Sequence, residues 1–220
     1  MAKILGIYGS GGLGREVLEL SKIINSGNNR WDEVIFIDDY RSETQFKSLK
    51  VLSYDVMKEN INPMDIEIII GIGEPESRRV LAEKIMHDGY ELATLIHPNV
   101  HIPESTTIGS GSVICANVFV SCDVRIGENV YVQPHASVGH DTSIENNSVI
   151  SGFVNISGSC YIGMNTYVGA SVCIKEKAII GNNTIVGMGS VVIRNIPDGV
   201  TALGNPARPM KMNDEKKVFK

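Results

Sequence analysis

From Ile96 to Pro197 the chain repeats a pattern with a period of six residues, and every block of six begins with Ile or Val. The fifth position of each block holds a small or β-branched side chain, and the fourth is usually Asn, Asp, Ser or Gly. The aliphatic position predicts a short buried strand, and the fourth-position residues tolerate left-handed backbone at a corner. Stacked coils bury an apolar column that no single block could bury alone, so the pattern predicts a parallel β-helix.

Residues before Ile96 follow a different pattern, in which apolar strands alternate with amphipathic helices. Segments 3–9 and 33–39 are predicted strands on either side of a helix over 14–27, and segments 65–73, 74–90 and 91–97 repeat the plan. This alternation predicts a small Rossmann-like α/β domain.

We therefore divide the chain into an α/β domain over residues 1–95, a β-helix over 96–197 and a C-terminal extension over 198–220. The polar segment 41–50 is expected to be a surface excursion. The sequence after residue 197 is expected to leave the β-helix, and the charged segment 213–220 is expected to fray.

Composition narrows the classes of partner. The chain is 43% hydrophobic and 20% charged, with a formal net charge of -5 and no block of Lys or Arg, which disfavours nucleic acid or an anionic membrane as the main partner. Its apolar runs are shorter than the ~18 residues of a membrane span, and its start lacks the layout of a signal peptide, so we expect a cytoplasmic protein. The four cysteines lack paired spacing, which disfavours zinc or disulfide roles.

A glycine-rich motif follows the first predicted strand. Gly9, Gly11 and Gly14 form a G-x-G-x-x-G pattern before the first helix, and Asp38 and Asp39 end the next strand. Such glycines let the backbone approach phosphates at a helix N-terminus, and an acidic residue after the second strand suits a ribose. We predict a nucleotide-linked ligand here, with the amides of residues 10–12 facing phosphate. The predicted contacts are Gly9, Ser10, Gly11, Gly12, Asp38, Asp39 and Gly73.

The glycine motif has two alternative interpretations. A tight turn that needs glycine only for packing stays open. An NAD-dependent oxidoreductase is disfavoured, because the α/β part is too short for two mononucleotide-binding halves and a second catalytic domain.

Two histidines lie close together in the repeat. His135 occupies the fourth, corner position, where a structural role is favoured because His tolerates positive φ. His140 occupies the third position, which the repeat does not restrict, and Asp141 follows it. A carboxylate beside an imidazole raises its basicity for proton abstraction. The residue pattern alone leaves a catalytic and a merely solvated His140 both open.

The whole chain resembles the bacterial sugar acyltransferases that acetylate sialic acids or nucleotide-linked 4-amino sugars, members of the left-handed β-helix hexapeptide transferases. The matching features are YGSGGLGREV, FIDD, IGIGEPESRR, LIHP, GHD, the repeats and LGNPAR. The resemblance implies that the first domain binds the nucleotide-sugar, that the β-helix forms a homotrimer, and that acetyl-CoA lies between neighbouring subunits. It also implies that His140 is the general base with Asp141 beside it. Left-handedness rests on the resemblance alone, since general crossover rules favour the right-handed form.

The same resemblance implies a donor site on the later coils. Acetyl-CoA is expected near Gly158, Ala170 and Met188, with Arg208 at the nucleotide end of the cofactor, where a guanidinium suits phosphates. Many relatives carry a second histidine nine positions after the base. In this chain that position is Val149, which puts the positioning of the donor in doubt.

The leading hypothesis is therefore acetyl transfer from acetyl-CoA to the 4-amino group of a nucleotide-linked deoxy-amino sugar, in glycan or O-antigen synthesis. O-acetylation of sialic acid or another surface sugar is the near alternative. A γ-carbonic-anhydrase-like zinc hydratase is remote, because it would need a third ligand beside His135 and His140 and no other histidine suits. A non-catalytic sugar-nucleotide-binding subunit is the third class. The sugar, the nucleobase and the length of the acyl group stay open.

Overall fold

The computed structural model describes residues 3–219. Its N-terminal part is built on a six-stranded sheet of order β3-β4-β2-β1-β5-β6, in which only β3 runs antiparallel to its neighbour. The strands are β1 (Ile4–Tyr8), β2 (Glu33–Ile37), β3 (Gln45–Phe46), β4 (Leu49–Leu52), β5 (Ile66–Ile70) and β6 (Glu91–Leu92). The helices are α1 (Gly12–Asn28), α2 (Tyr54–Asn60), the short 3-10 helix η1 (Pro63–Asp65) and α3 (Pro75–His87).

The helices cover the sheet on two faces because successive strand residues point in opposite directions. Leu5 and Ile7 pack in the same apolar cluster as α1, whereas Tyr8 packs with α2 and α3. Segment 41–50, expected to be a surface excursion, contains β3 and the start of β4, which pair as a hairpin and extend the sheet.

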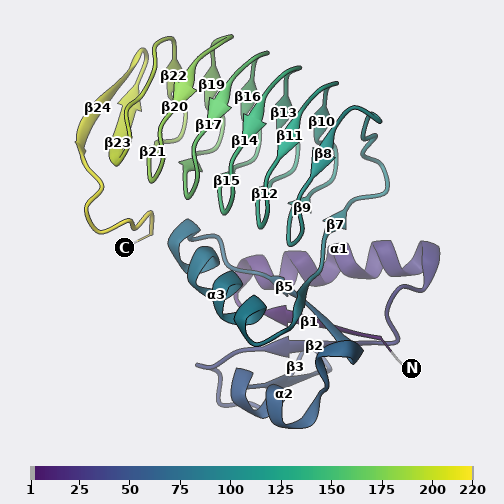
Figure 1. Ribbon diagram of the computed structural model, residues 1–220. Coiled ribbons are helices and arrows are strands. Elements are labelled where there is room, and N and C mark those ends of the chain that lie inside the picture. Colours follow the sequence, from purple (N-terminus) through teal and green to yellow (C-terminus); the bar gives the residue numbers. More distant parts are fainter. Residues whose placement is uncertain (1–2, 220) are drawn as a thin grey trace.

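The second part is a parallel β-helix with three faces, and strands eighteen residues apart pair with each other. Two faces are five-stranded sheets, β10-β13-β16-β19-β22 and β20-β17-β14-β11-β8. The third is the eight-stranded sheet β24-β23-β21-β18-β15-β12-β9-β7, which lies against the α/β part with α1 and α3 beneath it (Figure 1).

The strands of the β-helix are short up to β22. They are β7 (Leu95–Ile96), β8 (Thr107–Ile108), β9 (Val113–Ile114), β10 (Phe119–Val120), β11 (Arg125–Ile126), β12 (Tyr131–Val132), β13 (Ser137–Val138), β14 (Ser143–Ile144), β15 (Val149–Ile150), β16 (Asn155–Ile156), β17 (Tyr161–Ile162), β18 (Tyr167–Val168), β19 (Cys173–Ile174), β20 (Ile179–Ile180), β21 (Ile185–Val186), β22 (Val191–Val192), β23 (Val200–Gly204) and β24 (Ala207–Met212).

The corners of the β-helix confirm the reading of the fourth position. From Gly111 to Gly189 every sixth residue has positive φ, including His135 at 62° and Asp141 at 57°. One line of corners stacks asparagine side chains, whose amides are hydrogen-bonded from coil to coil between Asn129 and Asn183. The corner residues therefore repeat in register from coil to coil.

Arg78 joins the two parts of the molecule. Its guanidinium is fully buried and donates to the carbonyls of Ile70 and Ile72 in one part and to the carbonyl and side chain of Asn129 in the other. Burial lowers the pKa of Arg78 to about 10. Because Ile70 and Ile72 flank Gly71, the same side chain fixes the loop after β5 against the β-helix.

The C-terminal extension differs from the expectation in two ways. β23 pairs in parallel with β21, so the chain continues the eight-stranded sheet beyond residue 197 before β24 turns back. The expected fraying of segment 213–220 is wrong for its described part. The backbone amides of Val218 and Phe219 donate to the Glu74 carboxylate at 3.0 and 3.1 Å, and Figure 1 shows this segment descending from β24 towards α3. Lys220 lies outside the described residues.

Candidate active site

The glycine loop after β1 is shaped by close backbone contacts. A Cβ on Gly14 would lie 1.9 Å from the Gly9 carbonyl oxygen, and one on Gly71 would lie 2.6 Å from the Gly14 Cα. These two glycines are needed for packing. A Cβ on Gly11, in contrast, would meet no atom of residues 3–219 within 4 Å. The packing interpretation therefore accounts for Gly14 and leaves Gly11 facing open space that a ligand could fill.

Asp38 holds this loop in place. Its carboxylate accepts hydrogen bonds from the Ser10 amide at 3.0 Å, from the Ser10 hydroxyl, and from the amides of Tyr40 and Arg41. Partial burial opposes the charge on Asp38, but these hydrogen bonds outweigh it and keep its pKa below the ordinary value. The Ser10 amide, expected to face phosphate, is instead occupied by Asp38.

Asp39 accepts fewer hydrogen bonds than Asp38. One carboxylate oxygen accepts from the Tyr8 hydroxyl and the other accepts from the Tyr54 amide at 2.7 Å. A carboxylate has about four acceptor sites, so Asp39 keeps capacity for a ligand that Asp38 has used on its own chain. Burial, followed by the hydrogen bond to Asp39, raises the pKa of Tyr8, which keeps this hydroxyl protonated as a donor.

Asp39 and the glycine loop line a cavity of about 730 Å³ across the carboxyl ends of β1, β2 and β5. We call it the acceptor cavity. Its lining brings together the predicted residues Gly9, Ser10, Gly11, Gly12, Asp38, Asp39 and Gly73, and adds residues of α3 that the sequence did not single out, among them Glu76, Ser77 and Lys84. Ligands of open α/β sheets bind at this edge.

A second cavity of about 610 Å³ shares Gly12 with the first and lies between α1 and the β-helix. Arg15, Glu16 and Glu19 line it from the helix. Its β-helix side comes from the eight-stranded sheet and the corners that follow it, with His97, Cys115, Ala116, Tyr131 and Pro134. Sequence reasoning missed this cavity because its two walls belong to different parts of the chain.

The His140 side chain pairs with its neighbour. Nδ1 lies 2.7 Å from Asp141 Oδ2, and since an ionised carboxylate only accepts hydrogen bonds, this contact favours the tautomer with the proton on Nδ1. Nε2 is then the nitrogen able to take a proton. A Cβ on Gly158, one coil later, would lie 2.5 Å from His140 Nε2, so glycine there leaves room for the ring.

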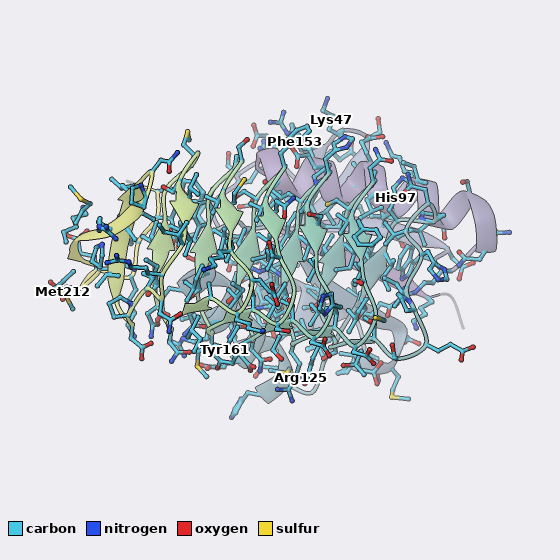
Figure 2. All side chains as sticks on the ribbon, turned by 90° about the horizontal axis from the view of Figure 1, so that it is seen from above. Lys47, His97, Arg125, Phe153, Tyr161 and Met212 are labelled. Carbon is cyan, nitrogen blue, oxygen red and sulfur yellow. The ribbon has the colours of Figure 1, made fainter. Side chains whose placement is uncertain are left out.

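His135 lies at another edge of the β-helix, in the corner between β12 and β13. Its ring stacks on Phe153 with centroids 4.9 Å apart. Phe153 has φ 59° and is 64% exposed, an uncommon backbone conformation for a bulky residue with little burial in return. Figure 2 shows Phe153 on the α1 side with Lys47 and His97, opposite Arg125 and Tyr161. The sequence signal for Phe153 was its corner position, where the repeat favours small polar residues.

The expected donor residues are divided between these edges. Gly158 lies beside His140, in corners that join the two five-stranded sheets. Ala170 and Met188 follow β18 and β21 on the edge that carries Phe153, and Arg208 is exposed in β24. Val149 is buried on β15. One chain alone therefore brings His140 close neither to Ala170 and Met188 nor to the acceptor cavity.

Within residues 3–219, no group of three or more His, Cys, Asp and Glu side chains is arranged to hold a metal ion. In the same range, no helix combines the length and the apolar character needed to cross a membrane.

Two family models match the chain. The model of the PglD N-terminal domain matches residues 4–85, and that of the bacterial transferase hexapeptide, with six repeats, matches residues 123–158. These matches cover the glycine loop with Asp38 and Asp39, and the coils that carry His140.

Similar proteins cover more of the chain. The acetyltransferase domain of PglB from Neisseria gonorrhoeae FA1090 has a TM-score of 0.88 and 31% identity, over 94% of this chain and 100% of that one. The structure of that domain in complex with acetyl coenzyme A matches 96% of this chain and 100% of that one at 30% identity, with a TM-score of 0.88. The GDP-perosamine N-acetyltransferase of Escherichia coli O157:H7 is 30% identical over 139 residues, which span 58% of this chain and 60% of that enzyme.

Proposed function

The chain belongs to the bacterial sugar acetyltransferases of the hexapeptide-repeat family, with a Rossmann-like domain followed by a left-handed β-helix, and on that premise we propose what it acts on. The proposed reaction transfers the acetyl group of acetyl-CoA to the 4-amino group of a nucleotide-linked deoxy-amino sugar. The likeness to PglB's acetyltransferase domain and to a GDP-perosamine N-acetyltransferase supports this choice of donor and acceptor.

The observation that carries the proposal is the contact of 2.7 Å between His140 and Asp141. An amine that attacks a thioester must lose a proton as the tetrahedral intermediate forms, and an imidazole has the right basicity near neutral pH. In the proposed reaction His140 Nε2 takes this proton. Asp141 orients the ring through Nδ1 and stabilises the imidazolium that results.

The proposed acceptor site is the acceptor cavity. Its glycine loop at the N-terminus of α1 suits phosphates, and Asp39 has carboxylate capacity for a ribose or base. These features favour a nucleotide-linked acceptor over a free sugar. Asp38 acts in this proposal by holding Ser10 and the loop.

The proposed donor site runs along Gly158, Ala170 and Met188, with Arg208 towards the phosphates of coenzyme A. Met188 is 81% exposed and open to such a ligand. Because Gly158 and Ala170 lie on different edges of one β-helix, a donor that touches both must lie between two copies. We therefore include a homotrimer in the proposal, with His140 of one copy serving the acceptor cavity of another.

The same proposal includes a sugar-nucleotide-binding domain over residues 1–95 and an acyltransferase domain over 96–197, whose sheet β23 and β24 extend. It also includes a role in polysaccharide precursor synthesis and a cytoplasmic location. A measurement of mass in solution tests the assembly. A monomer at micromolar concentration would contradict it.

The acceptor is tested by release of free thiol from acetyl-CoA. The panel contains UDP-, dTDP- and GDP-linked 4-amino sugars and free sialic acid. We expect turnover with at least one nucleotide-linked amine and none with free sialic acid. Thiol release with sialic acid alone would favour sugar O-acetylation over the proposed reaction. No thiol release with any member of the panel would support a non-catalytic binding role.

A further inference from the structure

The C-terminal segment 213–219, which we call the strap, is tied to the rest of the molecule at both of its ends. At the start, the Asn213 amide donates to the Gly199 carbonyl at 2.7 Å and its side chain donates to the Asn183 carbonyl at 2.9 Å. At the other end, the amides of Val218 and Phe219 reach Glu74. Ordering a surface segment costs backbone entropy, so these contacts have to offset it.

The anchor of the strap lies at the edge of the acceptor cavity. Glu74 directly precedes α3 and follows Gly73, which lines the cavity. Both Glu74 carboxylate oxygens accept the Val218 amide at 3.0 Å. The strap therefore occupies both carboxylate oxygens of an acidic residue next to a site proposed for an anionic ligand.

Phe219 adds an aromatic surface to this edge. Its ring meets Tyr167 edge-on with centroids 5.6 Å apart, and it lies 3.7 Å from the place where a Cβ of Gly73 would stand. The Leu13 side chain lies 3.5 Å from the same place. Phe219 is nevertheless 57% exposed, so much of its ring is available for a further contact.

A charged residue of the strap also affects this edge of the acceptor cavity. Glu76, another residue of the cavity lining, has a pKa lowered first by its hydrogen bond from Arg79 and further by the charge of Lys216 in the strap. The strap thus acts on two lining residues of the acceptor cavity, Gly73 by contact and Glu76 by charge.

We propose that the strap completes the acceptor cavity and that Phe219 is an acceptor-binding residue. This inference rests on the proposed function. The cavity runs from Asp39 after β2, across the glycine loop, to Gly73 after β5. The ribose or base of the acceptor lies at Asp39 and its phosphates lie at the loop. Its sugar ring then reaches Gly73 and packs against Phe219. Aromatic side chains supply large contact areas for such a ring.

The test is calorimetry on the full chain, with the nucleotide-linked 4-amino sugars and, separately, coenzyme A as ligands. We expect Phe219→Ala to raise the acceptor Kd about tenfold, the equivalent of roughly 1.4 kcal/mol of lost contact. Phe219→Tyr is expected to keep the acceptor Kd within about twofold of the wild-type value, because it preserves the ring. The Kd of coenzyme A is expected to stay unchanged in both variants.

Met64→Ala is the matched control. Met64 is an exposed apolar side chain of the α/β part, just before β5 and so at the opposite edge of the sheet from the cavity. We expect it to change neither Kd. Melting temperatures of all variants within about 2 °C of wild type would exclude a folding defect.

Hydrogen exchange of the wild-type protein is a second test of the role of the strap. We expect the amides of Val218 and Phe219 to exchange more slowly when the acceptor is bound. An unchanged acceptor Kd in Phe219→Ala overturns the inference while leaving the proposed function in place, and a tighter Kd would mean that the strap blocks the cavity. Wild-type protein that binds none of the nucleotide-linked sugars would instead overturn the proposed function and the inference with it.

Discussion

The acceptor cavity and the His140 corner hold their functional groups by different means. In the cavity, Ser10, Asp38 and Gly71 come from the ends of three strands; Ser10 is hydrogen-bonded to Asp38, and Gly71 packs closely against Gly14. At the corner, His140 is oriented by the next residue and given room by Gly158 one coil later. The backbone of the corner is set by hydrogen bonds that the whole β-helix repeats. A change at the corner should therefore affect chemistry alone, whereas a change in the cavity should affect both folding and binding.

The largest effect on turnover is expected at the corner. His140→Ala should lower kcat by about 10² to 10⁴, because it removes the proposed general base. Its melting temperature should stay close to that of wild type, since the His140 side chain is 55% exposed. Thiol release measures kcat, and thermal unfolding measures the melting temperature.

His135→Ala is the control for this change, since it removes an imidazole from the same repeat. It should cost far less turnover. If turnover survives His140→Ala within about threefold while His135→Ala abolishes it, the two histidines are assigned in the wrong order.

The largest effect on folding is expected in the glycine loop. Gly14→Ala would place a Cβ 1.9 Å from the Gly9 carbonyl oxygen. Two backbone segments would have to move apart, and we expect the free energy of unfolding to fall by about 3 kcal/mol or more. Denaturant unfolding measures it.

Gly27→Ala is the matched control in the same helix. A Cβ there would meet no described atom within 4 Å, so the substitution should raise the free energy of unfolding by up to about 1 kcal/mol through helix propensity. Equal effects of the two substitutions would refute the packing role of Gly14.

A smaller effect, on the binding of the acceptor, is expected at Asp39. Asp39→Asn should raise the KM of the nucleotide-linked acceptor about tenfold while leaving that of acetyl-CoA alone, because Asp39 has capacity to bind the ligand directly. Steady-state kinetics with each substrate varied in turn measures this. An unchanged acceptor KM would count against the position proposed for the acceptor.

Asp38 should affect how the stability of the fold depends on pH. Its folded-state pKa lies below the ordinary value, so its carboxylate stabilises the fold above an ordinary pKa of about 4, and this contribution is lost as the pH falls through the folded-state pKa. Asp38→Asn should therefore flatten the loss of stability in acid. A variant as acid-sensitive as wild type would contradict the role of Asp38 as the anchor of the loop.

The smallest effect is expected at Phe153. Phe153→Asn places at a left-handed corner a residue that favours it, and Phe153 is 64% exposed, so little burial is lost. We expect the free energy of unfolding to rise by up to about 1 kcal/mol. A loss of more than about 1 kcal/mol would show that the stack with His135 stabilises the coil more than the strained backbone costs.

The corners could be predicted from the sequence because the period of six fixes the register of every coil. The positive φ values of His135 and Asp141 followed from their positions in the block. The pairing of His140 with Asp141 is also local and could be expected from adjacency. The divergent roles of Asp38 and Asp39 could not, because they depend on Ser10 for Asp38 and on Tyr8 and Tyr54 for Asp39, which lie in distant segments.

Long-range contacts set the limit of the prediction. Arg78 meets Asn129 across 51 residues of chain, and Val218 meets Glu74 across 144. Asn129 is a corner of the repeat, and Arg78 and Glu74 lie in IGIGEPESRR, but neither pattern names its distant partner. The sequence therefore signalled neither the buried link between the two parts nor the strap. The segment 213–219 was expected to fray because its composition is charged, yet the backbone amides of Val218 and Phe219, which composition does not reveal, hold it.

The most direct test of the account compares two acceptors that share nucleotide and sugar and differ only in an amine or a hydroxyl at C4. Thiol release and identification of the product are measured with wild-type protein and acetyl-CoA. We expect rapid transfer to the amine with an amide product, little transfer to the hydroxyl, and loss of the reaction in His140→Ala. Equal or faster transfer to the hydroxyl, or an amide formed at an undiminished rate by His140→Ala, would contradict this expectation.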